Sequence, residues 1–144
     1  MVRAPKRAGK RAIEKFITEK ENWIRTKQQE TRDAYENKKS ELLTDAQKLK
    51  MKNLAKKVFA AKTAHFARIM GVTYGRITIR EQKTRWGSCS SAGNLNFNWK
   101  LLLGPEEVVD YVVVHELAHR REMNHSARFY AVVAEIMPDY KVWQ

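Results

Sequence analysis

The sequence predicts a small α+β domain in which helices precede and follow a short β-sheet. Apolar residues recur every three or four positions from about residue 10 to 24 and again from 44 to 70, which is the spacing of amphipathic helices. Between residues 77 and 99 apolar and polar residues alternate, which is the period of half-buried strands. A third helical pattern begins at Pro105. With 144 residues, the chain is long enough to form one compact domain.

We expect this single domain to span residues 1–144 in two halves. Residues 1–71 form a basic, mainly helical half, and residues 72–144 form the half that holds the sheet and the candidate site. The first nine residues contain the helix breakers Pro5 and Gly9, so they are expected to be irregular.

Two helices are predicted in the first half. The first begins near Lys10 and carries a sparse apolar stripe of Ile13, Phe16, Ile17, Trp23 and Ile24. The very polar segment 25–41 fits either an exposed helix or a hairpin connection. Thr44 is the expected N-cap of the second helix, and Gly71 is its expected C-terminal glycine. Its inward residues should be Leu49, Leu54, Val58, Phe59, Phe66 and Ile69.

Two strands and a turn follow these helices. In the first strand Ile77 and Ile79 alternate with Thr78 and Arg80. The second strand has the same alternation, with inward residues Leu95, Phe97 and Trp99. Residues 90–94, SSAGN, predict the turn that leads into this second strand.

The third helix is predicted from its ends and from its apolar stripe. Pro105 suits the first helical position, and acidic residues follow it, which matches the positive end of the helix dipole. Arg120 and Arg121 match the negative end in the last turn. The buried stripe should consist of Val108, Val109, Val112, Val113 and Leu117.

This helix contains the HExxH motif of zinc enzymes, from His115 to His119. Residues four apart differ by only about 40° around a helix, so both imidazoles can face one metal ion, with Glu116 beside them. The alternative is a chance pair of surface histidines. The apolar stripe that leads into the motif, and a third histidine close by, argue against that alternative.

His125 is the expected third ligand, because a catalytic zinc usually has three protein ligands and one open position. On a continuous helix His125 would point about 80° away from His115, so the chain must turn first. Asn124 tolerates the left-handed conformation of such a turn, and Ser126 can cap the next helix. The spacing equals that of the metzincins, although Glu122 stands where they have glycine. An alternative third ligand is the downstream Glu135.

A closing helix is predicted from Ser126 to Met137, before Pro138. Its inward residues should be Phe129, Val132, Val133 and Ile136. The remaining histidine, His65, stands alone in the second helix, so we leave it out of the metal site.

Positive charge is concentrated in the first half of the chain. The first 71 residues carry 19 Lys and Arg against 8 Asp and Glu, whereas the rest carry 9 against 8. This asymmetry fits either a nucleic-acid partner or a solvated helical surface, and we favour the solvated surface because no nucleic-acid fold signature accompanies it. Cys89 is the only cysteine, and no apolar run is long enough to span a bilayer. We therefore expect a cytoplasmic protein without a membrane partner.

Several motifs resemble the YgjP-like zinc metallopeptidases, a bacterial family related to the SprT and WLM (Wss1-like) proteases. They are TRWGSC at 84–89, GNLNFNW from Gly93, DYVVVHEL from Asp110 and the triplet Asn124-His125-Ser126. The segments VRAPKR at 2–7 and EKFITEKENWI at 14–24 also resemble the family. Family members usually begin with a strand-rich stretch before VRAP, so we expect either a shortened form or a fragment here.

The resemblance implies a zincin-like α+β fold, a Zn2+ cofactor and a peptide or protein substrate. It implies that His115, His119 and His125 are the zinc ligands and that Glu116 is the general base. In related proteases a strand above the metal binds substrate, so Arg85, Trp86 and Gly87 are candidates for that rim. The alternative is that Trp86 is core and Gly87 a bulge. Tyr111, Tyr130 and Tyr140 are candidates for oxyanion stabilisation.

The hypothesis is zinc-dependent hydrolysis of peptide bonds, with a zinc-activated water and Glu116 as general base. The alternative is a DNA-associated protein whose zinc site is structural or vestigial. A hybrid of the two is a DNA-associated protease of the SprT kind, in which the basic half brings the enzyme to DNA.

Overall fold

The computed structural model describes residues 10–144, without the side chains of residues 10, 12–14 and 16–25. The predicted irregular segment 1–9 and the predicted apolar stripe of the first helix lie outside these described parts. The chain divides into two compact units, Met1–Tyr35 and Glu36–Gln144.

Helix α1, Lys10–Glu41, accounts for the described part of the first unit and continues into the second. Its polar surface carries local side-chain contacts, such as the ion pair of Lys27 with Glu30 at 2.7 Å. Gln29 also donates a hydrogen bond to Asp33 at 2.7 Å. The polar segment 25–41 is thus helical, so the helix alternative is confirmed and the hairpin alternative is wrong.

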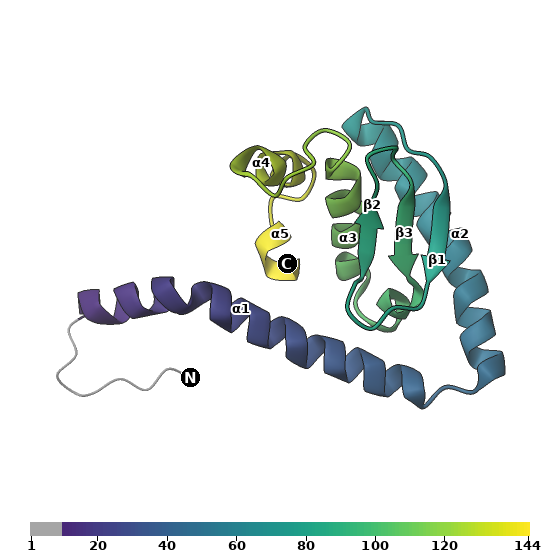
Figure 1. Ribbon diagram of the computed structural model, residues 1–144, viewed down its shortest axis with the longest axis horizontal. Coiled ribbons are helices and arrows are strands. Elements are labelled where there is room, and N and C mark those ends of the chain that lie inside the picture. The colour runs from purple at the N-terminus through teal and green to yellow at the C-terminus, as the bar shows by residue number, and fades with distance from the viewer. Residues whose placement is uncertain (1–9) are drawn as a thin grey trace. The chain divides into compact units, whose positions relative to one another are not determined.

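The second unit is built on a three-stranded sheet of order β1-β3-β2 (Figure 1). Strand β1, Ile77–Arg80, runs parallel to β3, Leu95–Asn98, and β2, Gly87–Cys89, runs antiparallel to β3. The central strand is the most buried of the three. Strand β2 therefore forms one edge of the sheet.

Two helices pack against the sheet and against each other (Figure 1). Helix α2, Asp45–Met70, packs on β1, and helix α3, Glu106–Ala118, packs on β2. The Phe59 ring from α2 stacks on Phe97 from β3, with centroids 4.6 Å apart. The short 3-10 helix η1, Trp99–Leu103, begins with Trp99, which was predicted as the end of a strand and is fully buried.

The ends of α2 are as predicted, but its inward face is partly wrong. Thr44 caps the helix by accepting a hydrogen bond from the backbone N–H of Gln47, and Gly71 ends it with φ of 65°. The buried residues are Ala55, Phe59, Thr63, Ala67 and Met70, whereas the predicted core residues Leu49, Leu54 and Ile69 are about half exposed or more. Three of these five buried residues, Ala55, Thr63 and Ala67, are small, which allows α2 to pack closely on its neighbours, while its leucines lie on the exposed side.

Two more helices follow α3 along the chain. Helix α4, Ala127–Ile136, packs on α3, and so does the short helix α5, Tyr140–Trp143. Phe129, Val132 and Val133 are buried as predicted. The last residues of α1 belong to this unit, since Lys39 donates to the carbonyl of Leu103 and Lys100 donates to Asn37. Among the described residues, no helix combines the length and apolarity that a membrane span requires.

Candidate metal centre

Helix α3 carries the HExxH motif at its C-terminal end. His115 and Glu116 lie in its last turn, and His119 occupies the C-cap position with helical backbone angles. The predicted valine stripe and Leu117 are buried. Pro105 is the N-cap rather than the first helical residue, and the two arginines that were predicted in the last turn follow the helix. The i, i+4 geometry of the two histidines is preserved despite these shifts.

A tight turn between α3 and α4 brings the third histidine back to the first two. The backbone N–H of Ser126 donates to the carbonyl of Asn124 at 2.8 Å, and the Ser126 hydroxyl caps α4. No non-glycine residue of the described chain has a positive φ. The expectation of a left-handed Asn124 is therefore wrong, because the bond between Ser126 and Asn124 closes the turn in ordinary backbone conformations.

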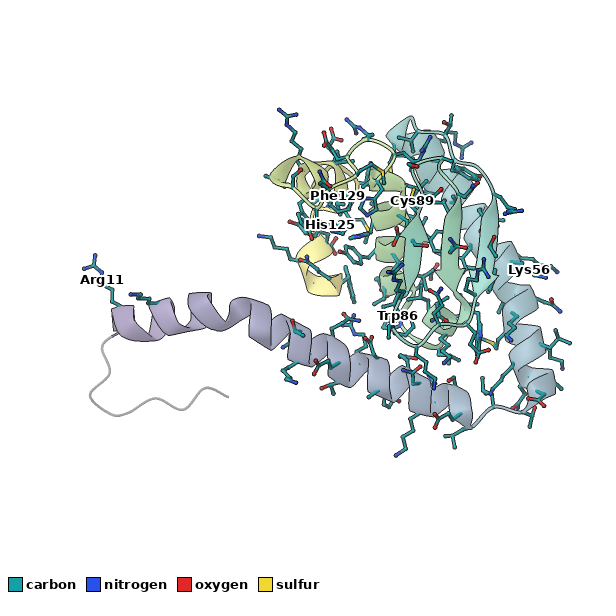
Figure 2. The ribbon with its side chains drawn as sticks, viewed as in Figure 1. Arg11, Lys56, Trp86, Cys89, His125 and Phe129 are labelled. Atoms are coloured by element: carbon teal, nitrogen blue, oxygen red, sulfur yellow. The ribbon has the colours of Figure 1, made fainter. Side chains whose placement is uncertain are left out.

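The three histidines converge on one point. One ring nitrogen from each of His115, His119 and His125 lies within 4.8 Å of the other two, and the Nε2 atoms of His115 and His125 are 3.0 Å apart. The fully buried Phe129 ring contacts all three imidazoles, with centroid distances of 4.6 to 4.9 Å. Figure 2 shows His125 and Phe129 side by side, between α3 and α4.

Hydrogen bonds at Nδ1 select Nε2 as the free nitrogen of two rings. The hydroxyl of Tyr111, one helical turn before His115, lies 3.2 Å from its Nδ1. The Nδ1 atom of His119 lies 3.2 Å from the carbonyl oxygen of Glu122, which can only accept. A ligand histidine commonly donates its second ring N–H in this way, which fixes both its tautomer and its orientation.

The environment also favours neutral imidazoles, which are the form that binds metal. Burial, together with the neighbouring His119 and His125, lowers the pKa of His115 to about 3. Burial and the neighbouring His125 also lower the pKa of His119. Neither group competes strongly for a proton at neutral pH, so both keep a lone pair available.

Glu116 points from α3 toward the edge strand β2. Its side chain is only 6% exposed, and burial raises its pKa to about 7. A Cβ atom at Gly87 would lie 3.0 Å from the Glu116 Oε1 atom and 3.1 Å from a Val112 methyl, so glycine permits this close approach. Gly87 pairs in regular register with Phe97, so the bulge reading is wrong, while the half-buried Trp86 packs against the core.

The other candidates have different surroundings. Glu135 forms an exposed ion pair with Arg121 at 2.9 Å and is not part of the histidine cluster. His65 is exposed on α2. Among the described residues, the three histidines are the only set of His, Cys, Asp or Glu side chains close enough to share an ion.

Two aromatic residues of this centre were not predicted as members. Phe129 was expected only in the core, and Tyr111 was considered only for the oxyanion. The helical spacing supplies a signal for Tyr111, which stands four residues before His115 on the same helix. No such spacing identifies Phe129, because His125 lies outside α4.

The comparisons with known proteins agree with this geometry. The YgjP-like family, described as a metallopeptidase domain, matches residues 36–144, the same residues that form the second compact unit. The crystal structure of the metallopeptidase zymogen abylysin from Pyrococcus abyssi is 25% identical, with a TM-score of 0.54 over 59% of this chain and 87% of that chain. The zymogen jannalysin from Methanocaldococcus jannaschii has the same fold, at 18% identity and a TM-score of 0.51 over 58% of this chain and 90% of that chain. No curated protein matches.

The family and the fold support a protease, and a metallopeptidase domain implies a metal ion. The small α+β fold expected from the sequence is confirmed. The resemblance that the sequence motifs indicated is confirmed too, over the whole of the second unit: this chain belongs to the YgjP-like metallopeptidase family.

Proposed function

We propose that the chain is a zinc-dependent peptidase in which His115, His119 and His125 hold the metal and Glu116 is the general base. The convergence of the three ring nitrogens carries this proposal, together with the buried Glu116, which directly follows His115 on the same helix. Three imidazoles form a donor set typical of zinc, and the exposed His125 leaves one side of the cluster open to solvent. When bound, zinc lowers the pKa of a water and polarises a carbonyl oxygen.

Glu116 is suited to proton transfer at neutral pH. A general base works best when its pKa lies near the pH of the reaction, and burial brings the pKa of Glu116 to about 7. In this role Glu116 takes a proton from the attacking water and then delivers it to the leaving amine. Its contact with β2 holds it in place for both transfers.

The free edge of β2 is the proposed binding site for the substrate backbone. The Trp86 carbonyl and the Ser90 N–H both bond to the β3 side. Because antiparallel strands alternate their hydrogen-bonding direction, the polar backbone groups of Gly87 and Cys89 point away from β3. An extended peptide can pair with these groups, directly beside Glu116. Figure 2 shows Cys89, the last residue of β2, and Trp86, which directly precedes the strand.

Tyr130 is the best placed of the three tyrosines to stabilise the oxyanion. The Tyr111 hydroxyl is hydrogen-bonded to Nδ1 of His115, on the side of the ring away from Nε2. Tyr130 lies on α4, and its ring centroid is 6.4 Å from that of His125. Tyr140 stacks on the Tyr130 ring, with centroids 5.7 Å apart, and this packing restricts the orientation of Tyr130.

The test is to measure metal content by mass spectrometry together with peptide hydrolysis. The wild-type protein should hold about one zinc per chain, and His125→Ala should lose most of it. Glu116→Gln should keep the zinc but hydrolyse peptides at a rate lower by about 10²–10⁴-fold. Exposed Glu107→Gln is the matched control on the same helix. Full turnover by Glu116→Gln would rule out its assigned role.

A nucleic-acid partner is a second proposal, supported by the outward face of α2. Lys50, Lys57 and Arg68 are exposed, and their spacings of seven and eleven residues return to the same side of a helix. None of these three forms an ion pair with another described residue. Replacing all three with glutamine should weaken binding to a short DNA duplex and flatten its salt dependence. Binding that is absent, or insensitive to salt, would exclude the proposal.

A further inference from the structure

Arg120 connects the metal helix to two loops that are distant in sequence. It directly follows His119, and its backbone N–H donates to the carbonyl of Leu117 at 3.0 Å. Its Nε donates to the carbonyl of Thr73 at 2.8 Å, in the loop between α2 and β1. One terminal nitrogen donates to the carbonyl of Ser91 at 3.1 Å, in the turn between β2 and β3.

The turn between β2 and β3, which Arg120 contacts, is held by several hydrogen bonds of its own. The N–H of Gly93 donates to the carbonyl of Ser90, and the N–H of Asn94 donates to the Ser90 hydroxyl. The N–H of Gly75 donates to the carbonyl of Gly93 at 2.8 Å, which joins the turn to the loop before β1. A displacement of the turn is therefore passed on to β2, because Ser90 directly follows Cys89.

Gly93 supplies the space in which the guanidinium lies. Its φ is 87°, in the region that favours glycine, and a Cβ there would lie 2.7 Å from the Arg120 Cζ atom. Both the conformation of the turn and the room beside it therefore depend on Gly93. The planar guanidinium can donate to two carbonyls at once, whereas a lysine ammonium lacks this flat, forked geometry.

We propose that Arg120 is a positioning residue that sets the distance between the edge strand β2 and the metal-binding histidines. Strand β2 touches α3 at one end, where Gly87 meets Glu116, and Arg120 holds its other end through Ser91. We call Arg120 and its bonds to Thr73 and Ser91 the clamp. The contact at Gly87 and the clamp together fix both ends of the strand relative to the helix that carries His115 and Glu116. As a determinant of substrate binding, this role rests on the proposed peptidase function.

The same geometry distinguishes Arg120 from the arginine beside it. Arg121 pairs only with the exposed Glu135, and its side chain is 43% exposed. Arg121 has the same charge as Arg120 and is its neighbour in the chain. Among the described residues, however, it forms no hydrogen bond or ion pair with either of the two loops that Arg120 contacts. Arg121→Ala is therefore a matched control for the loss of a positive charge after His119.

The experiment compares wild-type protein with Arg120→Ala, Arg120→Lys and Arg121→Ala, all loaded with zinc. With a peptide long enough to lie along β2, Arg120→Ala should raise KM about tenfold and change kcat by less than threefold. A misplacement of about 1 Å can reduce catalytic efficiency by up to about 100-fold, and here the displaced element binds substrate. Arg120→Lys should recover part of this loss, and Arg121→Ala should match the wild type. A general loss of folded protein would instead lower kcat and leave KM unchanged.

Hydrogen exchange tests the clamp without reference to activity. In Arg120→Ala the amides of Ser90 and Gly93 should exchange faster, whereas the amides around Phe59 in α2 should keep their wild-type rates. Unchanged exchange at Ser90 and Gly93 would overturn the clamp. Absence of hydrolysis by the zinc-loaded wild type, with faster exchange in Arg120→Ala, would refute the peptidase function and the substrate role but leave the clamp itself standing.

Discussion

Helices α2 and α3 both pack on the sheet, but they place their polar residues in different environments. Of the 26 residues of α2 five are buried, while Lys50, Lys56, Lys57 and Arg68 are exposed. Of the 13 residues of α3 nine are buried, and Glu116 is one of them. On α3, burial lowers the pKa of His115 to about 3 and raises the pKa of Glu116 to about 7. Both shifts disfavour the charged form of the side chain. The short helix therefore holds the residues of the proposed site, while the long one packs behind them through a few buried side chains.

The largest expected effect tests whether α2 supports the domain through its buried stripe alone. Phe59→Ala removes a fully buried ring that stacks on Phe97, so it should lower the free energy of unfolding by about 3–5 kcal/mol. Leu54→Ala removes a side chain that is 48% exposed, so it should change that free energy by about 0.5 kcal/mol or less. Denaturant titrations followed by circular dichroism measure both. Equal losses would mean that the outer face of α2 is covered in solution.

The next effect tests whether the buried carboxylate of α3 opposes folding. The pKa of Glu116 is about 7 when folded, against an ordinary value of 4.5, so the folded state binds more protons between these values. Stability is therefore lost as pH rises from 4.5 to 7, by about 3 kcal/mol in total. In metal-free protein, Glu116→Gln should raise the free energy of unfolding at pH 8 by up to that amount, and by less than about 1 kcal/mol at pH 5.

The control for this measurement is the exposed Glu107→Gln, which should show no such dependence on pH. A gain for Glu116→Gln that is the same at both pH values would point to improved packing instead of relief of a buried charge.

The smallest effect concerns the hydroxyl that faces His115. Tyr111→Phe keeps the buried ring but removes the hydrogen bond to Nδ1, so it should weaken zinc affinity about tenfold. Competition with a coloured chelator measures this affinity. Tyr130→Phe is the control. The Tyr130 hydroxyl accepts a hydrogen bond from Gln144 and, among the described residues, forms none with a ring nitrogen of the three histidines. Equal affinities in the wild type and Tyr111→Phe would remove Tyr111 from the metal centre.

The candidate site was predictable where its parts are close in sequence. His115, Glu116 and His119 share two turns of one helix, and His125 follows six residues later, so spacing alone indicates the cluster. The inward face of α2 was harder to predict, because Ala55 and Ala67 are buried on it while Leu49 and Leu54 are exposed. Leu49 is more hydrophobic than Ala55, so hydrophobicity alone predicts that Leu49 is the buried residue. Close packing between α2 and its neighbours instead favours the smaller alanine at the buried position.

Contacts between segments that are distant in sequence could not be predicted from the sequence. Arg120 meets Thr73 and Ser91, which are 47 and 29 residues away, and no local pattern records those partners. Its position after the HExxH motif indicated only a favourable interaction with the helix dipole. The packing of Glu116 against Gly87 depends likewise on the register of β2 with β3.

The contact of Phe129 with all three imidazoles has a consequence for how the domain responds to metal. Rings that touch a common, fully buried neighbour have little freedom to rotate, so much of the entropic cost of ordering the donors is met during folding. Attachment of α4 and retention of the ion are then thermodynamically linked. A metal at 100 times its dissociation constant would stabilise the joined arrangement by about 2.7 kcal/mol. Chelation would therefore loosen the junction of α3 and α4 first, while α2 and the sheet keep their own packing.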